Sequence, residues 1–254
     1  MGALHEGHAT LIRRARGEDA TVVVSIFVNP IQFDRPEDLA HYPRTLDADV
    51  ALCTSLGVDA VFAPTATEMY PEPPEMNITV GTLGDHLCGS SRPGHFSGVA
   101  TVAMKLLQIV QPDRAYFGEK DAQQLAVIRQ LVTSFNVPVE IASVPTVREA
   151  DGLAMSSRNR RLSARGRTHA LALVRAIRAT VHAISSGADT ASARKAGRET
   201  LPTDESARLD YLEVVDALTM QPVDRVERPA IVAGALWVEG VRLIDNMPVA
   251  PPAR

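Results

Sequence analysis

Apolar residues in the first half of the chain occur either in short continuous runs or with helical periodicity. Residues 21–28 form a β-branched run, which is typical of a strand buried on both faces of a parallel sheet. Shorter runs predict further strands at 59–63, 114–117 and 139–144, and helices are predicted between these strands. This alternation predicts an α/β fold, a doubly wound parallel sheet in which residues 21–28 form a central strand.

The pattern changes in the second half of the chain. Ala-rich helical periodicity at 163–185 and 191–201 is followed by predicted strands at 211–217, 230–238 and 241–246. Helices followed by antiparallel-type strands are typical of a small α+β unit. We therefore expect a sheet domain at residues 1–147 and a C-terminal α+β lid domain at residues 148–254.

Composition narrows the class of protein. The chain has 254 residues, of which 45% are hydrophobic and 22% charged, and a net charge of −4, which gives no general attraction for nucleic acid or anionic membranes. No apolar run approaches the length of a membrane span. Cys53 and Cys88 form neither a disulfide framework nor a metal-binding spacing. These features predict a cytosolic protein that binds neither nucleic acid nor membranes.

The first eight residues, MGALHEGH, carry the strongest candidate chemistry. His5 and His8 lie three positions apart where a helix begins, and Gly7 leaves space for a ligand to approach the backbone. Imidazole donors beside a helix N-terminus suit a phosphate whose charge increases during bond breaking. Two alternatives remain: a pair of exposed histidines at a frayed end, or a metal pair, although no third ligand follows from the sequence.

The ends of predicted strands supply further candidates. Gln32 follows the run 21–28, and the segment 118–121 (Gly118, Glu119, Lys120, Asp121) follows the strand 114–117, with Gln124 just beyond it. Ligands bind outside the carboxyl ends of strands in open α/β sheets, so Lys120 is placed to neutralise phosphate charge and the glutamines to hydrogen-bond a polar substrate. The alternative is a solvated lysine among acids that favour a helix N-terminus.

Two arginine-bearing segments are candidate anion clamps. Arg92 lies in a Gly/Ser-rich segment, 88–99, that is predicted to be a loop, and residues 155–158 combine Met155 with two hydroxyls and Arg158. A flexible connection and a solvated basic surface are the corresponding alternatives.

Several motifs together resemble one family. The chain is similar to pantothenate synthetases, the pantoate–β-alanine ligases, over almost its whole length, through the motifs MGALHEGH, SIFVNPIQFDRPEDLAHYPRT, SRPGHFSGV, LLQIVQPDRAYFGEKDAQQLAVIRQL, VPTVREADGLAMSSRNRRL and LIDN. The resemblance implies a cytosolic homodimer of the nucleotidyltransferase superfamily, with a Rossmann-like domain and a C-terminal lid. It implies that ATP, with Mg²⁺, adenylates pantoate, and that β-alanine then displaces AMP to form the amide.

The resemblance also implies residue roles. It assigns catalysis to His5, His8 and Lys120, with His8 as the proton donor and no metal held by protein side chains alone. Pantoate is assigned to Gln32 and Gln124, β-alanine to Gln32, and the pocket loop to Arg92. The implied ATP-binding residues are Met1, Gly2, Ala3, Leu4, His5, Glu6, Gly7, His8, Gly118, Glu119, Lys120, Asp121, Val147, Met155, Ser156, Ser157 and Arg158.

The chain departs from the family pattern in two places. Ala122 stands where the family usually has a large aromatic residue. The family also has a helix and a central strand before the position of Met1, so we expect the chain as written to bind ATP poorly and to be unstable, because two strands lose ladder partners.

Two rival functions remain. One is a nucleotidyltransferase of the same superfamily that acts on a phosphorylated acceptor, although neutral Gln32 and Gln124 suit a small hydroxy acid better. The other is an inactive, truncated paralogue.

Overall fold

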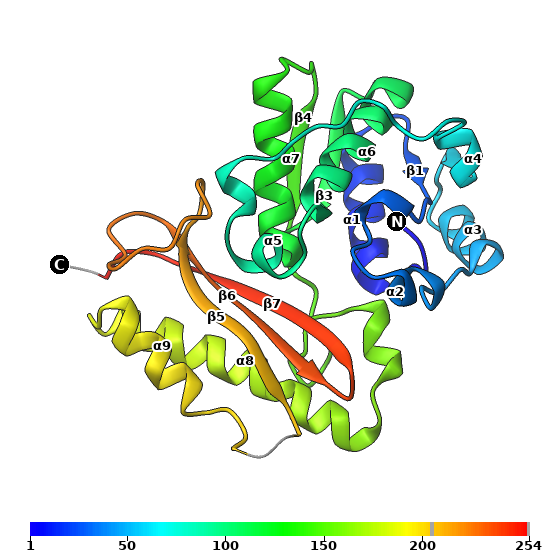
Figure 1. Cartoon of the computed structure of the whole chain (residues 1–254). Helices are drawn as coiled ribbons and strands as arrows, with labels where there is room; N and C mark the ends of the chain where they lie inside the picture. The colour runs from blue at the N-terminus through cyan, green and yellow to red at the C-terminus, as the bar shows by residue number, and fades with distance from the viewer. Residues whose placement is uncertain (204–205, 253–254) are drawn as a thin grey trace.

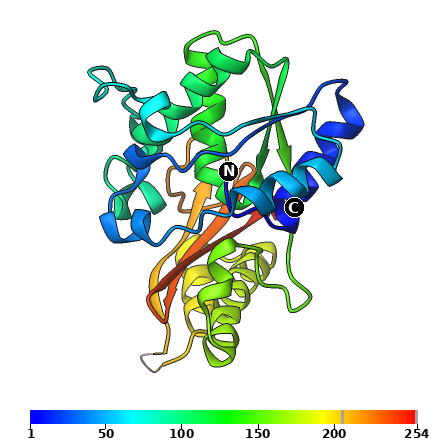
Figure 2. The same ribbon diagram turned by 90° about the vertical axis from the view of Figure 1, so that its right-hand side faces the viewer.

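The computed structural model describes residues 1–203 and 206–252. Helices and short parallel strands from the first half of the chain form one body, and a long antiparallel sheet backed by two helices forms the other (Figure 1). The turned view shows the two bodies stacked one above the other (Figure 2). The predicted fold class is confirmed: a nucleotidyltransferase-like α/β arrangement with a C-terminal antiparallel sheet.

The N-terminal body contains the elements predicted from periodicity and several short ones that were not predicted. Its strands are β1 (Val23–Ser25), β2 (Ala60–Phe62), β3 (Arg114–Gly118) and β4 (Glu140–Val144). Its helices are α1 (Glu6–Glu18), α2 (Pro36–Ala40), α3 (Leu46–Ser55), α4 (Ala66–Met69), α5 (Leu87–Ser91), α6 (His95–Val110) and α7 (Ala122–Ser134). Its 3₁₀-helices are η1 (Pro30–Gln32), η2 (Thr82–Gly84) and η3 (Glu119–Asp121).

The parallel strands form two separate pairs. β1 pairs with β2 and β3 pairs with β4, both in parallel, with Val24 opposite Val61 and Tyr116 opposite Ala142. The expectation that residues 21–28 form a central strand buried on both faces is wrong. Among the described strands, β1 pairs with β2 alone, and its other edge is contacted only by Met1, through the Ser25 carbonyl and the Phe27 N–H. Val24 packs with α1 and α3, but Val23 points to the other face and is 39% exposed, so the strand is not buried on both faces.

The segment 88–99, predicted to be a loop, is largely helical. It contains most of α5 and the first turn of α6, so the prediction of a loop is wrong. Gly98 allows close packing: a Cβ at this position would lie 2.4 Å from the carbonyl oxygen of Ile31. This contact presses α6 against η1, the turn that carries Gln32.

The C-terminal body is a three-stranded antiparallel sheet covered by two helices. The chain passes through η4 (Ser157–Arg161), α8 (Ala164–Ser185) and α9 (Thr190–Arg198) into β5 (Arg208–Asp216), β6 (Ala230–Val238) and β7 (Val241–Val249). Leu173 and Ile177 of α8 are fully buried against the sheet, in a core of their own. The sheet therefore has one face against α8 and the other towards the N-terminal body (Figure 1).

Candidate functional site

The histidine turn forms the N-terminal cap of α1. The His5 Nδ1 atom accepts a hydrogen bond from the backbone N–H of Gly7 (3.2 Å), and the His8 Nδ1 atom accepts one from the backbone N–H of His5 (3.3 Å). The two ring centroids are 4.0 Å apart. A Cβ on Gly7 would lie 3.0 Å from the His5 ring, so glycine at this position lets the ring fold back over the turn.

These bonds fix the chemical state of both rings. A ring nitrogen that accepts from a backbone amide carries no proton, so in the neutral form each proton lies on Nε2. Burial, with His5 and Lys120 as further causes, lowers the pKa of His8 to about 3. Burial and the Lys120 charge also lower the pKa of His5. Near neutral pH the turn therefore offers two neutral Nε2–H donors.

Asp49 on α3 binds the backbone of this turn, a role that the sequence did not predict. Its carboxylate accepts the backbone N–H groups of Ala3 (2.9 Å) and Leu4 (2.8 Å), and the residue is 3% exposed. Ala3 has a φ of +49°, a conformation that the two bonds help to keep. An acid in the first turn of a predicted helix looks like a favourable helix charge, so no pattern in the sequence signalled this role.

A cavity of about 510 Å³ lies between the N-terminal body and the C-terminal sheet. Its walls include six of the predicted site residues, namely Arg92, Lys120, Asp121, Gln124, Ser156 and Arg158. His5, His8 and Gln32 are not on these walls. Lys120 nevertheless lies close enough to both imidazoles to lower the pKa of each, which joins the histidine turn to the cavity.

Gln32 is held at the end of η1 by residues that the sequence analysis did not select. The Asn29 amide nitrogen donates to the Gln32 Oε1 (3.1 Å) and to the carbonyl of Gly98 (3.1 Å), and the Tyr70 hydroxyl donates to the Asn29 Oδ1 (2.9 Å). Asn29 is 2% exposed. This arrangement occupies the Gln32 oxygen and leaves its NH₂ group to donate to a ligand.

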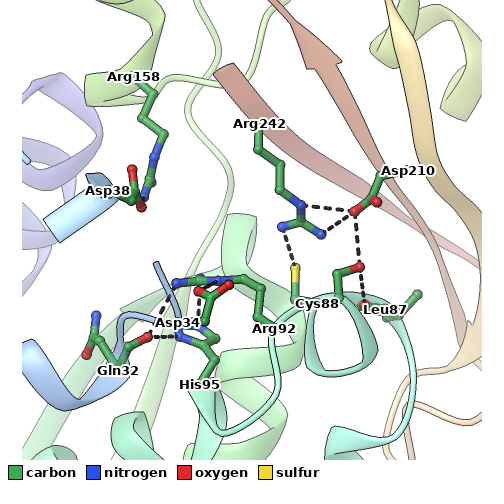
Figure 3. A network of polar contacts seen from close by, with 11 residues as sticks. Gln32, Asp34, Asp38, Leu87, Cys88, Arg92, His95, Arg158, Asp210 and Arg242 are labelled. Atoms are coloured by element: carbon green, nitrogen blue, oxygen red, sulfur yellow. Dashed lines mark hydrogen bonds and ion pairs between the residues drawn. The ribbon is translucent and has the colours of Figure 1, made fainter. Parts of the chain in front are cut away.

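Arg92, the C-cap residue of α5, is engaged within the chain. Its guanidinium bonds to Asp34 (2.8 Å), to the His95 Nε2 (3.1 Å) and to the carbonyl of Gln32 (3.3 Å). Burial and the neighbouring Arg92 lower the pKa of His95 to about 4. Figure 3 shows Arg92 lying between Asp34 and the Gln32–His95 pair, so it supports the Gln32 turn.

Arg158 faces an acid across the cleft. Its guanidinium forms an ion pair with Asp38 of α2 (3.0 Å) and lies over the Tyr42 ring, 5.7 Å from the ring centroid. The Ser156 hydroxyl accepts the backbone N–H of Arg158 (3.3 Å) and caps η4. The guanidinium predicted to hold phosphate is thus paired with a carboxylate of the same chain, and its role as an anion clamp stays a prediction (Figure 3).

The remaining residues predicted to bind ATP do not line this cavity. The Leu4 side chain packs in the core, and Glu6 forms an exposed ion pair with Arg13, so neither side chain faces the cavity. The Gly7 N–H lies 3.2 Å from the Met155 sulfur, which brings the segment 155–158 to the histidine turn. The other positions lie along β1, at the end of β3 or beside Met155: Met1, Gly2, Gly118, Glu119, Val147 and Ser157.

The described residues contain neither a metal-ligand cluster nor a membrane-spanning helix. Among them, no group of three or more His, Cys, Asp or Glu side chains is arranged to hold a metal ion. In the same part of the chain, no helix combines the length and apolarity needed to cross a membrane.

Fold and site together define a nucleotidyltransferase-like α/β protein with a cleft between its two bodies. The pantothenate synthetase of Thermus thermophilus has a similar structure, with a TM-score of 0.94 and 48% identity over 99% of this chain and 91% of that chain. A pantoate-beta-alanine ligase from Francisella tularensis, complexed with Beta-gamma ATP and Beta-alanine, superposes with a TM-score of 0.77 and 36% identity, covering 97% of this chain and 86% of that one.

Residues 1–248 match the sequence model of the family described as Pantoate-beta-alanine ligase, and the chain belongs to this family. The pantothenate synthetase of Corynebacterium glutamicum (strain R) is 51% identical over 97% of this chain and 90% of its own length. A bifunctional pantoate ligase/cytidylate kinase of Synechococcus elongatus is 53% identical over 97% of this chain. The chain spans about half the length of such bifunctional relatives, 48% in this case.

Proposed function

We propose that the chain catalyses the ATP-dependent condensation of pantoate with β-alanine through a pantoyl-adenylate intermediate. A pantoate carboxylate oxygen attacks the α-phosphorus of MgATP, the bond to the β-phosphate breaks, and pyrophosphate leaves. The β-alanine amine then attacks the acyl carbon, AMP leaves with the bonding electrons, and the amine gives up a proton as the amide forms. Family membership and the relative complexed with Beta-gamma ATP and Beta-alanine support this proposal.

The observation that carries the proposal is the proximity of Lys120, which lies on the cleft wall, to the two neutral imidazoles of the histidine turn. An ammonium and two Nε2–H donors suit the negative charge that builds on phosphate oxygens during adenylation. Burial lowers the pKa of His8 to about 3 in the chain without nucleotide, so its ring meets an incoming phosphate as a neutral hydrogen-bond donor.

The acceptor side of the site is neutral. Gln32 presents its NH₂ group after Asn29 occupies its oxygen, and Gln124 lies on the cavity wall. Two amides suit the hydroxyls and carboxylate of pantoate, whereas a phosphorylated acceptor would be better matched by additional cations. We assign pantoate to these two residues, β-alanine to Gln32, and the phosphates to Lys120, Ser156, Ser157 and Arg158.

We also propose the metal, the domain roles, the oligomeric state and the compartment of the enzyme. We propose that Mg²⁺ enters with the nucleotide, because Mg²⁺ keeps several of its waters and is usually bound through substrate phosphates. Residues 1–147 form the nucleotide and pantoate domain and residues 148–254 the lid, the active form is a homodimer, and the enzyme works in the cytoplasm.

The test is pyrophosphate release from MgATP with pantoate present and β-alanine absent. We expect release only with pantoate, and pantothenate once β-alanine is added. Lys120→Ala should lower the rate at least about 100-fold, whereas Lys195→Ala, the same change at an exposed position of α9, should not. Release with phosphorylated acceptors but not with pantoate would instead favour another nucleotidyltransferase, and no release with any acceptor would favour the inactive paralogue.

A further inference from the structure

The LIDN motif lies on β7, far along the chain from the nucleotide-binding segments, and the roles above do not use it. Its last residue, Asn246, is 8% exposed. The Asn246 amide nitrogen donates to the backbone carbonyls of Glu119 (2.9 Å) and Lys120 (2.8 Å). Both protons of this NH₂ group are therefore directed at the turn η3, which carries Lys120.

The neighbouring residue makes a second connection to the same side of the cleft. Asp245 is 4% exposed, and its carboxylate forms a two-point ion pair with Arg148, at 2.7 and 2.9 Å. Arg148 follows Val147, whose carbonyl accepts the backbone N–H of Met155 (2.9 Å). Consecutive residues of β7 thus contact the segment 118–121 directly and, through Arg148, the chain next to Val147.

The position of Lys120 depends on its backbone. Over residues 1–203 and 206–252 its ammonium forms no ion pair, in contrast to Arg92 and Arg158. The residue before η3, Gly118, supplies no side-chain cap to this turn. The Asn246 amide is thus a side-chain group that fixes two successive carbonyls of the turn at its exit towards α7.

We propose that Asn246 is a positioning residue for Lys120, so that the C-terminal sheet sets the place of the phosphate-directed ammonium. This inference rests on the proposed function for its meaning in catalysis. Asn246 itself is not assigned a contact with substrate, because both of its amide protons are used by backbone carbonyls.

The test is a double-mutant cycle read out by MgATP affinity in calorimetry. Asn246→Ala should weaken MgATP binding about tenfold when Lys120 is present, since two buried hydrogen bonds are lost. In the Lys120→Ala background the same change should weaken binding less than about twofold. The matched control is Asn77→Ala, at an exposed position, which should leave the affinity unchanged in both backgrounds.

A purely structural role predicts a different pattern. It would weaken MgATP and pantoate binding together and would act equally in both Lys120 backgrounds, and either result overturns the proposal. Pantoate affinity and the melting temperature of each variant show whether the site is folded. Asn246→Asp, which keeps the shape and removes both donors, should reproduce the loss and serves as the second variant.

The outcomes also separate this inference from the proposed function. If MgATP binding shows the Lys120-dependent loss but pantoate triggers no pyrophosphate release, the function fails and the positioning role stands. If the unmodified chain binds no MgATP, both fail.

Discussion

Asp49 gives the sharpest prediction about how the histidine turn is held. Its carboxylate accepts the backbone N–H groups of Ala3 and Leu4 at 2.9 and 2.8 Å, and the Thr45 hydroxyl donates to it at 3.1 Å. Asp49→Ala removes the acceptor and leaves two buried N–H groups without a partner. Such groups cost about 1–3 kcal/mol each.

We therefore expect Asp49→Ala to lower the free energy of unfolding by about 3 kcal/mol, which corresponds to a fall in melting temperature of about 6–12 °C for a chain of this size. Asp47→Ala is the matched control, because Asp47 lies in the same helical turn but is exposed. It should cost about 0.5 kcal/mol, through the helix dipole alone.

Calorimetric unfolding and pyrophosphate release measure the two consequences. Release by Asp49→Ala at a temperature where the variant is folded should fall at least about tenfold, because the turn that carries His5 and His8 loses its support. The reasoning is refuted if Asp49→Ala and Asp47→Ala unfold within about 1 kcal/mol of each other, or if release is unchanged.

The Gln32 turn, the Arg158 ion pair and the buried histidines each provide a further test. Gly98→Ala should raise the KM for pantoate at least about fivefold with little change in that for MgATP, because its Cβ would lie 2.4 Å from the Ile31 carbonyl and displace the Gln32 turn; steady-state kinetics with each substrate varied will show whether the two effects separate. Asp38→Asn should tighten MgATP binding about two- to fivefold, because it frees Arg158 from a partly exposed ion pair; the exposed neighbour Glu37→Gln is the control, and weaker binding would contradict the idea. The pKa values of His8 and His95 fall from 6.5 to about 3 and about 4 on folding. Their contribution to stability is therefore complete above about pH 6.5 and is lost as pH falls towards those values. Between about pH 7 and about pH 4.5, the free energy of unfolding measured with denaturant should fall with pH, and His95→Gln should reduce this slope by about 1.4 kcal/mol per pH unit.

Local sequence patterns were sufficient to predict the fold class, but not which strands pair or which helices pack closely. The run 21–28 indicated a strand, yet its length and apolarity could not show that β2 is the one described strand that pairs with β1, or that Val23 is exposed. The glycines of the segment 88–99 suggested a loop, whereas Gly98 is required by the close approach of α6 to η1. Whether the family's upstream strand is needed for stability stays a prediction.

Residues that hold the candidate site were harder to find than those that face it. Asp49 and Asn29 act on backbone groups or on other side chains from distant parts of the chain, so no spacing in the sequence reveals them. LIDN was recognised as a family motif, but only the fold shows that the Asn246 amide donates to the Lys120 carbonyl. A sequence thus shows which residues can take part in a reaction more readily than it shows which residues position them.

The cap of α1 has a consequence for laboratory evolution. Ser or Asn at position 5 would cap a helix as well as His5 does, since each supplies an acceptor for the same amide. Selection for thermal stability alone would therefore tolerate the loss of this imidazole, whereas the proposed role of His5 predicts that a screen for turnover would reject it. Sequence libraries scored only by folding would therefore not retain histidine at this position.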